Sequence, residues 1–132
     1  MEVHQGGIYL YEPPTTSTSQ QAALVTTSGS EQSGLRPYVI VSRDLVNRGK
    51  PTAVGVPLST KTHKANSYRI MLPMAELIKG YDATEDFRNS VALCDHVRVL
   101  DITRIRKRIG TLSQNALNSV IGVGLAFVFD MR

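Results

Sequence analysis

Residues 113–130 read SQNALNSVIGVGLAFVFD, and here the chain changes from a strand pattern to a helix pattern. Apolar residues recur at helical spacing, and Ser113 stands where a helix N-cap is expected. Because several short strands precede this single helix, the sequence predicts an α+β fold that is mainly β. We expect a small, antiparallel, barrel-like sheet with the C-terminal helix packed against it. The predicted inner face of the helix consists of Leu117, Val120, Ile121, Gly124, Leu125 and Val128.

Two glycines, Gly122 and Gly124, lie within this helix. Each lowers helix propensity by up to ~1 kcal/mol relative to alanine, so we expect glycine here to permit close packing. Val123, Phe127 and Phe129 lie partly off the inner face. An exposed apolar patch of this kind usually marks an interface, and we therefore expect a homodimer.

Six strands are expected before the helix, because each segment is rich in β-forming residues and ends at turn residues. The second of them has an apolar run that indicates burial on both faces. Residues 74–80, MAELIKG, predict a short helical turn. The predicted strands are 7–13, 37–42, 52–60, 67–73, 90–101 and 104–112.

Composition predicts one soluble domain over residues 1–132, with an extended polar loop at about 13–34. The single cysteine, Cys94, excludes an internal disulfide and is expected to be a small buried residue. No apolar run approaches the ~20 residues that span a bilayer, so a cytoplasmic protein without membrane contact is expected. The net charge of +4 suits a polyanionic partner, whereas 6% aromatic residues and no Trp argue against base stacking as the main recognition mode.

Motifs for metal or nucleotide chemistry are missing. The three histidines, His4, His63 and His96, have no metal-ligand spacing, so no metal or other cofactor is expected. The segment GVGLAF at 122–127 lies within the helix pattern and does not follow a strand, so it is not a phosphate loop. SGSEQSG at 28–34 does not match the nucleophile elbow of esterases.

Three separated segments instead place polar residues at strand ends. The stretch GSEQSGLRP at 29–37 carries Glu31 and Arg36 directly before an apolar strand. Ser59 and Thr60 end the third predicted strand, and Asp95 interrupts the fifth. Each has a simpler interpretation: a surface ion pair for Glu31 and Arg36, hydroxyls bonded to their own backbone, and an aspartate that caps a turn or bonds across a dimer.

Taken together, these segments resemble the MazF/PemK/Kid toxin family, in order and spacing from about residue 6 to residue 128. The matching stretches are GGIYLYEP (6–13), GSEQSGLRPYVIVS (29–42), VPLST (56–60), SVALCDHVRVLD (90–101) and RIGTLS (108–113). The resemblance implies an SH3-like barrel with short helices and a C-terminal helix, assembled as a homodimer. It also implies a metal-independent endoribonuclease that cuts single-stranded mRNA at short sequences and is restrained by a cognate antitoxin.

Residue types fit that chemistry. Without a metal, the ribose 2'-OH attacks the phosphate and leaves a 2',3'-cyclic phosphate and a 5'-OH end, which requires a base, a cation and an acid. Arg36 can clamp two phosphate oxygens, and Glu31 is the natural base or the group that orients Arg36. Ser59, or Thr60 beside it, can hydrogen-bond the scissile phosphate. The resemblance gives Asp95 an acid–base or substrate-orienting role.

Further RNA contacts are expected from polar neighbours of these residues. His96 stands where relatives usually carry Gln, so a base-edge or backbone contact fits it. His63 follows Ser59 closely, but a solvated loop histidine is the simpler interpretation. The full set of RNA-binding candidates is Ser30, Gln32, Lys61, His63, His96 and Arg98.

The sequence departs from the family pattern in three places. The first loop is about ten residues longer than usual, Ser59 replaces the usual Thr, and Gly-Gly at 6–7 replaces Gly-Asp or Gly-Glu. The uncharged loop segment 15–28 is expected to be mobile, with its apolar AALV at 22–25 beside Glu31 and Arg36. Two alternatives stay open: a non-cleaving RNA- or protein-binding module, and a gyrase-poisoning toxin of related fold. Neither needs Glu31, Arg36 and Ser59 together.

Overall fold

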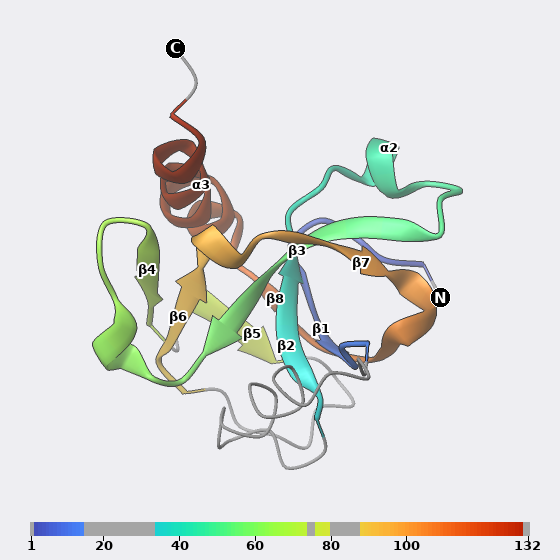
Figure 1. Ribbon diagram of the computed structural model, residues 1–132, viewed down its shortest axis with the longest axis horizontal. Helices are drawn as coiled ribbons and strands as arrows, with labels where there is room; N and C mark the ends of the chain where they lie inside the picture. The colour runs from blue at the N-terminus through green and yellow to red at the C-terminus, as the bar shows by residue number, and fades with distance from the viewer. Residues whose placement is uncertain (1, 15–33, 74–75, 80–87, 131–132) are drawn as a thin grey trace.

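The structure is a computed structural model that describes residues 2–14, 34–73, 76–79 and 88–130 (Figure 1). Its strands are β1 (Gly7–Tyr11), β2 (Arg36–Ile40), β3 (Thr52–Ser59), β4 (Arg69–Leu72), β5 (Leu77–Lys79), β6 (Ser90–Leu93), β7 (Arg98–Asp101) and β8 (Ile105–Leu112). The helix α2 (Asp44–Asn47) lies between β2 and β3, and short 3-10 turns cover Thr62–Lys64, Cys94–His96 and Ile102–Arg104. A π-helical segment (Ala116–Ile121) leads into α3 (Gly122–Phe129).

All strand pairs in this sheet are antiparallel, in the order β4-β6-β3-β2-β1-β8-β5, and β7 pairs with β3. The long strand β3 organises the sheet, because its first half pairs with β2 and β7 whereas its end pairs with β6. This confirms the predicted mainly β fold with a C-terminal helix. Within the described part of the chain, β4 and β5 each pair on one side, so the sheet wraps around without closing.

The helical turn expected at 74–80 is wrong for 77–79, whereas Glu76 before them lies in a 3-10 turn and Met74, Ala75 and Gly80 lie outside the described residues. Leu77–Lys79 forms β5 and pairs with the end of β8. Leu77 is 5% exposed and Ile78 is 55% exposed, which is the alternation of an edge strand. The segment is rich in good helix formers, but pairing with β8 overrides that local preference.

The single strand expected at 90–101 is also wrong in one respect. The 3-10 turn Cys94–His96 divides it into β6 and β7. Both strands pair with β3, but β6 pairs with its end and β7 with its beginning. The chain must therefore change position along β3 between them, and the turn that does so carries Asp95 and His96.

The C-terminal helix begins as predicted. The Ser113 hydroxyl accepts a hydrogen bond from the Ala116 N–H at 3.1 Å and donates one to the Glu76 carboxylate. Leu117, Ile121 and Gly124 are buried against the sheet, which confirms the predicted inner face at these positions; the Val120 side chain lies outside the described residues. A Cβ at Gly124 would lie 2.6 Å from the Cys94 sulfur, so this glycine permits the close approach.

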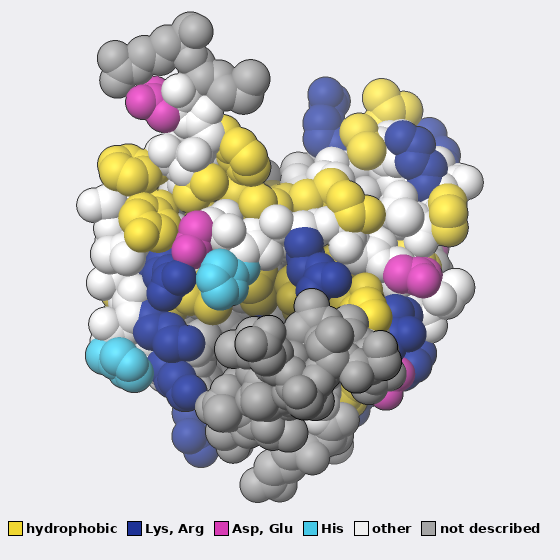
Figure 2. Space-filling model, in the orientation of Figure 1, with side chains coloured by type: hydrophobic (Ala, Val, Ile, Leu, Met, Phe, Trp, Pro, Cys, Tyr) yellow, Lys and Arg dark blue, Asp and Glu magenta, His cyan; other side chains and the backbone are white. Residues whose placement is uncertain are grey.

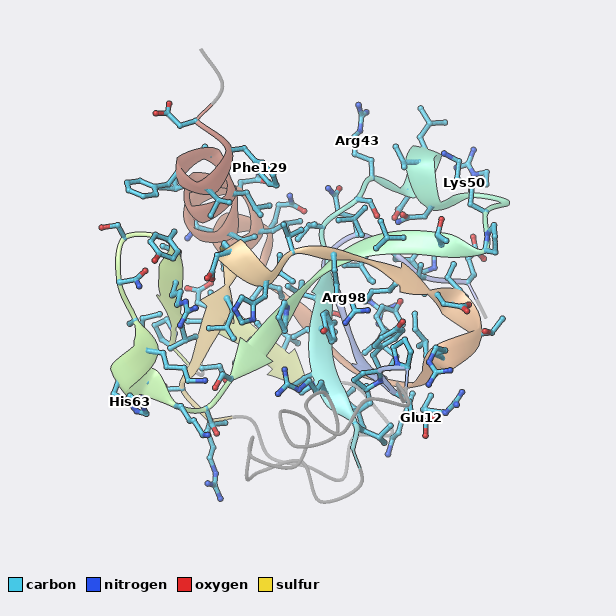
Figure 3. All side chains as sticks on the ribbon, in the orientation of Figure 1. Glu12, Arg43, Lys50, His63, Arg98 and Phe129 are labelled. Carbon is cyan, nitrogen blue, oxygen red and sulfur yellow. The ribbon has the colours of Figure 1, made fainter. Side chains whose placement is uncertain are left out.

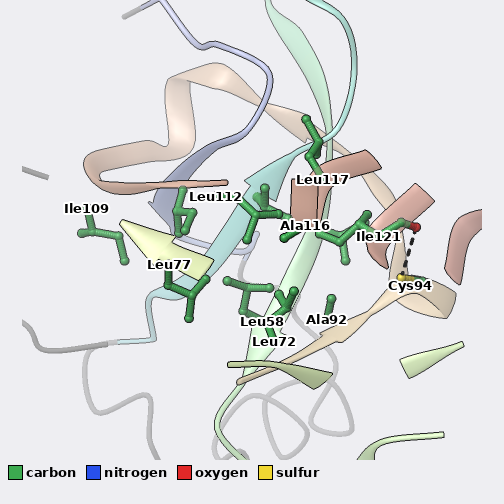
Figure 4. Packing of buried hydrophobic residues seen from close by; sticks show 13 residues of the cluster. Leu58, Leu72, Leu77, Ala92, Cys94, Ile109, Leu112, Ala116, Leu117 and Ile121 are labelled. Carbon is green, nitrogen blue, oxygen red and sulfur yellow. Dashed lines mark hydrogen bonds between the residues drawn. The ribbon is translucent and has the colours of Figure 1, made fainter. Parts of the chain in front are cut away.

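The buried residues form two clusters. The aliphatic cluster, between the sheet and the C-terminal helix, consists of Ile8, Val39, Val56, Leu58, Leu72, Leu77, Ala92, Cys94, Ile109, Leu112, Ala116, Leu117 and Ile121 (Figure 4). The tyrosine cluster consists of Val3, Tyr9, Tyr11, Tyr38, Ile40, Ala53, Leu100 and Ile105. Successive residues of β1 and β2 alternate between the two clusters, which confirms that the second predicted strand is buried on both faces.

No helix in the described part of the chain is long and apolar enough to cross a membrane. The expectations for the loop at 15–33, including its mobility and the position of AALV, lie outside the described residues.

Candidate active site

Two hydroxyl groups of the tyrosine cluster accept hydrogen bonds from the backbone. The Tyr9 hydroxyl accepts one from the His4 N–H at 3.1 Å, and the Tyr11 hydroxyl accepts one from the Asp101 N–H at 3.2 Å. Burial raises the pKa of the Tyr38 hydroxyl, and the nearby positive charges of Arg98 and Arg36 act the other way. Of the three tyrosines, Tyr38 is thus the one that lies near charged side chains.

Arg36 is the first residue of β2 and is half-buried at the rim of the tyrosine cluster. It lies across from Tyr11 of β1, and side chains alternate along a strand, so Arg36 shares a face with Tyr38 two residues later. Its positive charge is close enough to act on the Tyr38 hydroxyl. The sequence prediction that placed Arg36 at the entrance of a buried strand is confirmed.

Ser59 ends β3 at the point where this strand leaves β2. The β2–β3 pairing ends where Tyr38 lies opposite Pro57, two residues before Ser59. From Leu58 onward β3 pairs with β6 instead. The Ser59 Oγ accepts a hydrogen bond from the Lys61 N–H at 3.1 Å, which leaves its own hydrogen able to donate to a phosphate oxygen.

Thr60 is exposed immediately after this strand end, and Lys61 is half-buried. His63 lies in the exposed turn that follows, at the left edge of Figure 3. Arg98 is labelled near the centre of the same view, above β2. His63 and Arg98 therefore lie apart on this face.

Asp95 is held by an arginine that the sequence analysis missed. Arg69 of β4 donates from Nε to Asp95 Oδ1 at 3.0 Å and from Nη2 to Oδ2 at 2.8 Å. This two-pronged contact holds the pKa of the Asp95 carboxyl below its usual value, although partial burial acts the other way. An aspartate kept ionised in this way suits an orienting role better than that of a proton donor. Arg69 lies 26 residues before Asp95 in the sequence. Only a prediction that β4 lies beside the turn at Asp95 could have indicated it.

His96 extends this group toward the surface. Its Nε2 lies 3.6 Å from Asp95 Oδ2 and 3.4 Å from Arg69 Nη2, and the side chain is half exposed. On the face shown in Figure 2, lysine, arginine and histidine side chains gather at the left and centre, and hydrophobic side chains lie above them over α3. This face therefore offers positive charge and hydrogen-bond donors to an anion.

The predicted residues thus separate into three groups. Arg36 begins β2 and Arg98 begins β7, Asp95 and His96 meet at Arg69, and Ser59 lies at the end of β3 with Thr60 and Lys61. Ser30, Glu31 and Gln32 lie outside the described residues. In the described ranges, no group of three His, Cys, Asp or Glu side chains could hold a metal ion.

A hollow of about 410 Å³ lies elsewhere, beside α2. Its lining includes His4, Asp44 and Arg48, and none of the predicted site residues contributes to it.

Comparison with known proteins first defines a class, a small and mainly β toxin fold with a C-terminal helix. The Mycobacterium tuberculosis toxin MazF-mt6 superimposes with a TM-score of 0.65 at 15% identity, over 96% of this chain and 98% of that one. MazE–MazF from Deinococcus radiodurans gives 0.65 at 17% identity, over 100% and 99%. An endoribonuclease in complex with its cognate antitoxin from a mycobacterial species gives 0.64 at 18%, over 98% and 97%.

The sequence comparisons then define the family. The family described as "PemK-like, MazF-like toxin of type II toxin-antitoxin system" matches residues 5–122. The chain is also 30% identical to Endoribonuclease MazF of Staphylococcus saprophyticus over 99 residues. These residues make up 75% of this chain and 78% of that protein. The chain therefore belongs to the PemK-like, MazF-like toxin family of type II toxin–antitoxin systems. Its enzyme class is that of the endoribonuclease toxins.

Proposed function

We propose that this toxin is a sequence-specific, metal-independent endoribonuclease that cleaves single-stranded mRNA. In the proposed reaction, the ribose 2'-OH attacks the neighbouring phosphorus and the bond to the 5'-oxygen breaks, which leaves a 2',3'-cyclic phosphate and a 5'-OH end. The observation that carries the proposal is the position of Arg36, half-buried at the head of β2 and across from Tyr11 at the rim of the tyrosine cluster.

Arg36 supplies the positive charge that the reaction needs. The phosphorane formed by 2'-OH attack carries extra negative charge, and a guanidinium group can contact two of its oxygens at once. Partial burial places this charge where water screens it less than on an open surface. Because an arginine pKa lies above ~12, proton donation is demanding, and charge stabilisation is its main role.

The remaining roles follow from the groups near Arg36. Glu31 takes the 2'-proton or orients Arg36, a role that rests on its residue type and its place five residues earlier in the chain. The Ser59 hydroxyl donates to a phosphate oxygen, with Thr60 as its exposed neighbour. Asp95, held ionised by Arg69, orients substrate groups.

The RNA-binding surface extends outward from this centre. Arg98 and Lys61 offer positive charge to the flanking phosphates, which is the usual source of affinity for a nucleic-acid backbone. His96 and His63 offer ring nitrogens to base edges or phosphates, and Ser30 and Gln32 are proposed to contact RNA from the segment before β2. No cofactor takes part in this scheme.

A cognate antitoxin is the proposed protein partner, and the proposed location is the cytoplasm. One solved structure with the same fold is an endoribonuclease in complex with its cognate antitoxin, and another is MazE–MazF. The proposed assembly is a homodimer, because Val123, Phe127 and Phe129 of α3 are more than half exposed. Sedimentation of the purified chain at micromolar concentration is expected to give a dimer, and a monomer would contradict this.

The test of the proposed activity is incubation of the purified protein with a defined single-stranded RNA in excess EDTA. The expected result is cleavage at a short recurring sequence, with cyclic phosphate and 5'-OH ends in the products. Activity that disappears in EDTA and returns with Mg²⁺ would overturn the proposal. RNA binding without any cleavage would instead support a non-cleaving module.

A further inference from the structure

The turn between β6 and β7 is held in place from two sides. On one side α3 packs against it, since Cys94 is fully buried and a Cβ at Gly124 would lie 2.6 Å from its sulfur (Figure 1). On the other side Arg69 of β4 donates to both carboxylate oxygens of Asp95, at 3.0 and 2.8 Å. His96 completes the turn and is half exposed. The turn therefore presents the His96 ring to the surface from a fixed backbone.

Arg69 is itself fixed at the start of β4. Its backbone lies opposite Leu93 of β6, its N–H donates to the Asn66 side chain at 2.9 Å, and its carbonyl accepts from the Asn66 N–H at 2.9 Å. The Arg69 side chain is 25% exposed. A planar guanidinium group that is held by its strand and by a carboxylate has little rotational freedom left, so its remaining N–H groups point in set directions.

The contact between Arg69 and His96 decides which ring nitrogen of His96 carries the proton. A guanidinium group can only donate, so Arg69 Nη2 forms a hydrogen bond with His96 Nε2, 3.4 Å away, only when Nε2 is unprotonated. The Asp95 carboxylate would favour a proton on Nε2, but its Oδ2 is 3.6 Å away, beyond hydrogen-bond distance. The neutral ring therefore carries its proton on Nδ1, and no hydrogen bond among the described residues uses this nitrogen.

We propose that Arg69 is a positioning residue that orients His96 for contact with RNA. It fixes the turn through Asp95 and keeps His96 Nε2 as an acceptor, so that the Nδ1–H group is free to donate to an acceptor atom of the RNA. This inference rests on the proposed function, since it states which nitrogen of His96 contacts the RNA and which residue fixes its protonation.

The first test detects the tautomer directly. Nitrogen NMR of the free protein at about pH 8, where an ordinary imidazole is neutral, should show the His96 proton on Nδ1. Arg69→Lys can still pair with Asp95 but loses the planar fork, so the ring should shift toward the Nε2–H form that free histidine prefers in water. Arg48→Lys is the matched control, because Arg48 is exposed beside α2 and should leave the His96 signals unchanged. A proton on Nε2 in the wild-type protein would overturn the proposal.

The second test compares cleavage by Arg69→Lys, His96→Ala and the double variant. Arg69→Lys should raise KM about fivefold with kcat nearly unchanged, because the weakened contact binds RNA and does not touch the reacting atoms. The same substitution should have a smaller effect once His96 is alanine. A merely structural role for Arg69 would raise KM equally in both backgrounds, and that result, or an unchanged KM in Arg69→Lys, would overturn the proposal.

The sites cleaved by His96→Ala show which part of the RNA accepts the hydrogen bond. A contact to a base should alter the preferred sequence, whereas a contact to a phosphate should weaken cleavage of all sites alike. If the wild-type protein binds RNA without cutting it, the proposed function fails separately, and the same cycle measured on the Kd for a 2'-O-methyl RNA still decides the role of Arg69. A protein that binds no RNA would contradict both.

Discussion

The two buried clusters of this toxin are built from the same strands but differ in chemistry. β1 and β2 contribute Ile8 and Val39 to the aliphatic cluster, and Tyr9 and Tyr38 to the tyrosine cluster. The C-terminal helix covers the first cluster, and its packing is close enough for Gly124 to contact Cys94. The second cluster carries three hydroxyls, and those of Tyr9 and Tyr11 accept hydrogen bonds from backbone N–H groups.

Because of this difference, we expect the aliphatic cluster to contribute mainly to stability and the rim of the tyrosine cluster to contribute to function. Aliphatic side chains stabilise the fold through burial and dispersion, and they need no polar partner. A tyrosine contributes the same apolar ring but ends in a group that must be hydrogen-bonded when buried. The tyrosine cluster also borders the candidate site, because Arg36 lies across from Tyr11 at its rim. Substitutions in the two clusters should accordingly change different measurements.

The largest effect is expected at the rim of the tyrosine cluster. Arg36→Ala should lower the cleavage rate by about 10²- to 10³-fold, because it removes the charge on the developing phosphorane. The unfolding free energy should change by less than about 1 kcal/mol, as for other partly exposed positions. Arg36→Lys serves as the control that keeps the charge but loses the planar fork, and it should recover only part of the rate. Near wild-type cleavage by Arg36→Ala would remove Arg36 from the site.

The aliphatic cluster should show the opposite behaviour. Gly124→Val introduces a side chain that would collide with the Cys94 sulfur and with Ile70, at 2.6 and 2.9 Å from the new Cβ. Such overpacking should lower the unfolding free energy by about 1–3 kcal/mol, measured by urea denaturation, while the cleavage rate per folded molecule stays unchanged.

Gly122→Ala is the matched control for Gly124→Val. A Cβ at Gly122 would meet only the Leu117 carbonyl oxygen, at 3.6 Å, so alanine fits and should stabilise the helix by up to ~1 kcal/mol. Equal destabilisation by the two substitutions would show that helix propensity, rather than contact with Cys94, governs this region.

A smaller effect is expected at the end of β3. Ser59→Ala should lower the cleavage rate about tenfold, since it removes one hydrogen bond to the phosphate. Thr60→Ala should lower it less than threefold, because Thr60 is exposed beyond the strand end. The cleavage rates of the two variants, measured on the same RNA, show which substitution has the larger effect. The reverse order would mean that the phosphate lies one residue further along the chain.

The smallest effect concerns pH and the contact between Arg69 and Asp95. The pKa of the folded Asp95 carboxyl is lowered, chiefly by hydrogen bonds from Arg69, so its stabilising contribution is present above the unfolded pKa of about 4. That contribution is lost as the pH falls through the folded pKa. It should amount to no more than about 1 kcal/mol for this partly exposed pair.

Asp95→Asn should flatten the dependence of the unfolding free energy on pH between pH 6 and pH 3. Part of that dependence should persist, because the Asp101 pKa is also lowered, by hydrogen bonds from Thr103. An unchanged pH profile in Asp95→Asn would show that the contact contributes nothing measurable to stability.

Local features of the fold could be predicted from the sequence, whereas features that depend on distant pairing could not. The helix start at Ser113 and the alternation in β1 and β2 follow from residues within one or two turns of each other. The strand Leu77–Lys79 could not be predicted, because pairing with β8 overrides its helix-forming composition. The break at Cys94–His96 also escaped prediction, since only the position of β3 requires it.

The same limit applies to the site. Arg36, Ser59 and Asp95 could be proposed from the sequence because each stands at a strand end within a recognisable stretch. Arg69 could not, since it becomes relevant only when β4 lies beside the turn after β6.

The most direct test of metal-free attack by the ribose at this rim is cleavage of an RNA that carries a single 2'-deoxy nucleotide. The deoxy position is placed immediately 5' of the mapped cleavage site, and the all-RNA oligonucleotide is cut in parallel. The account predicts that cleavage at this bond is abolished while binding of the oligonucleotide persists, because the nucleophile itself has been removed. Cleavage of the deoxy-substituted bond at a comparable rate would contradict it, since some other nucleophile would then have to attack the phosphorus.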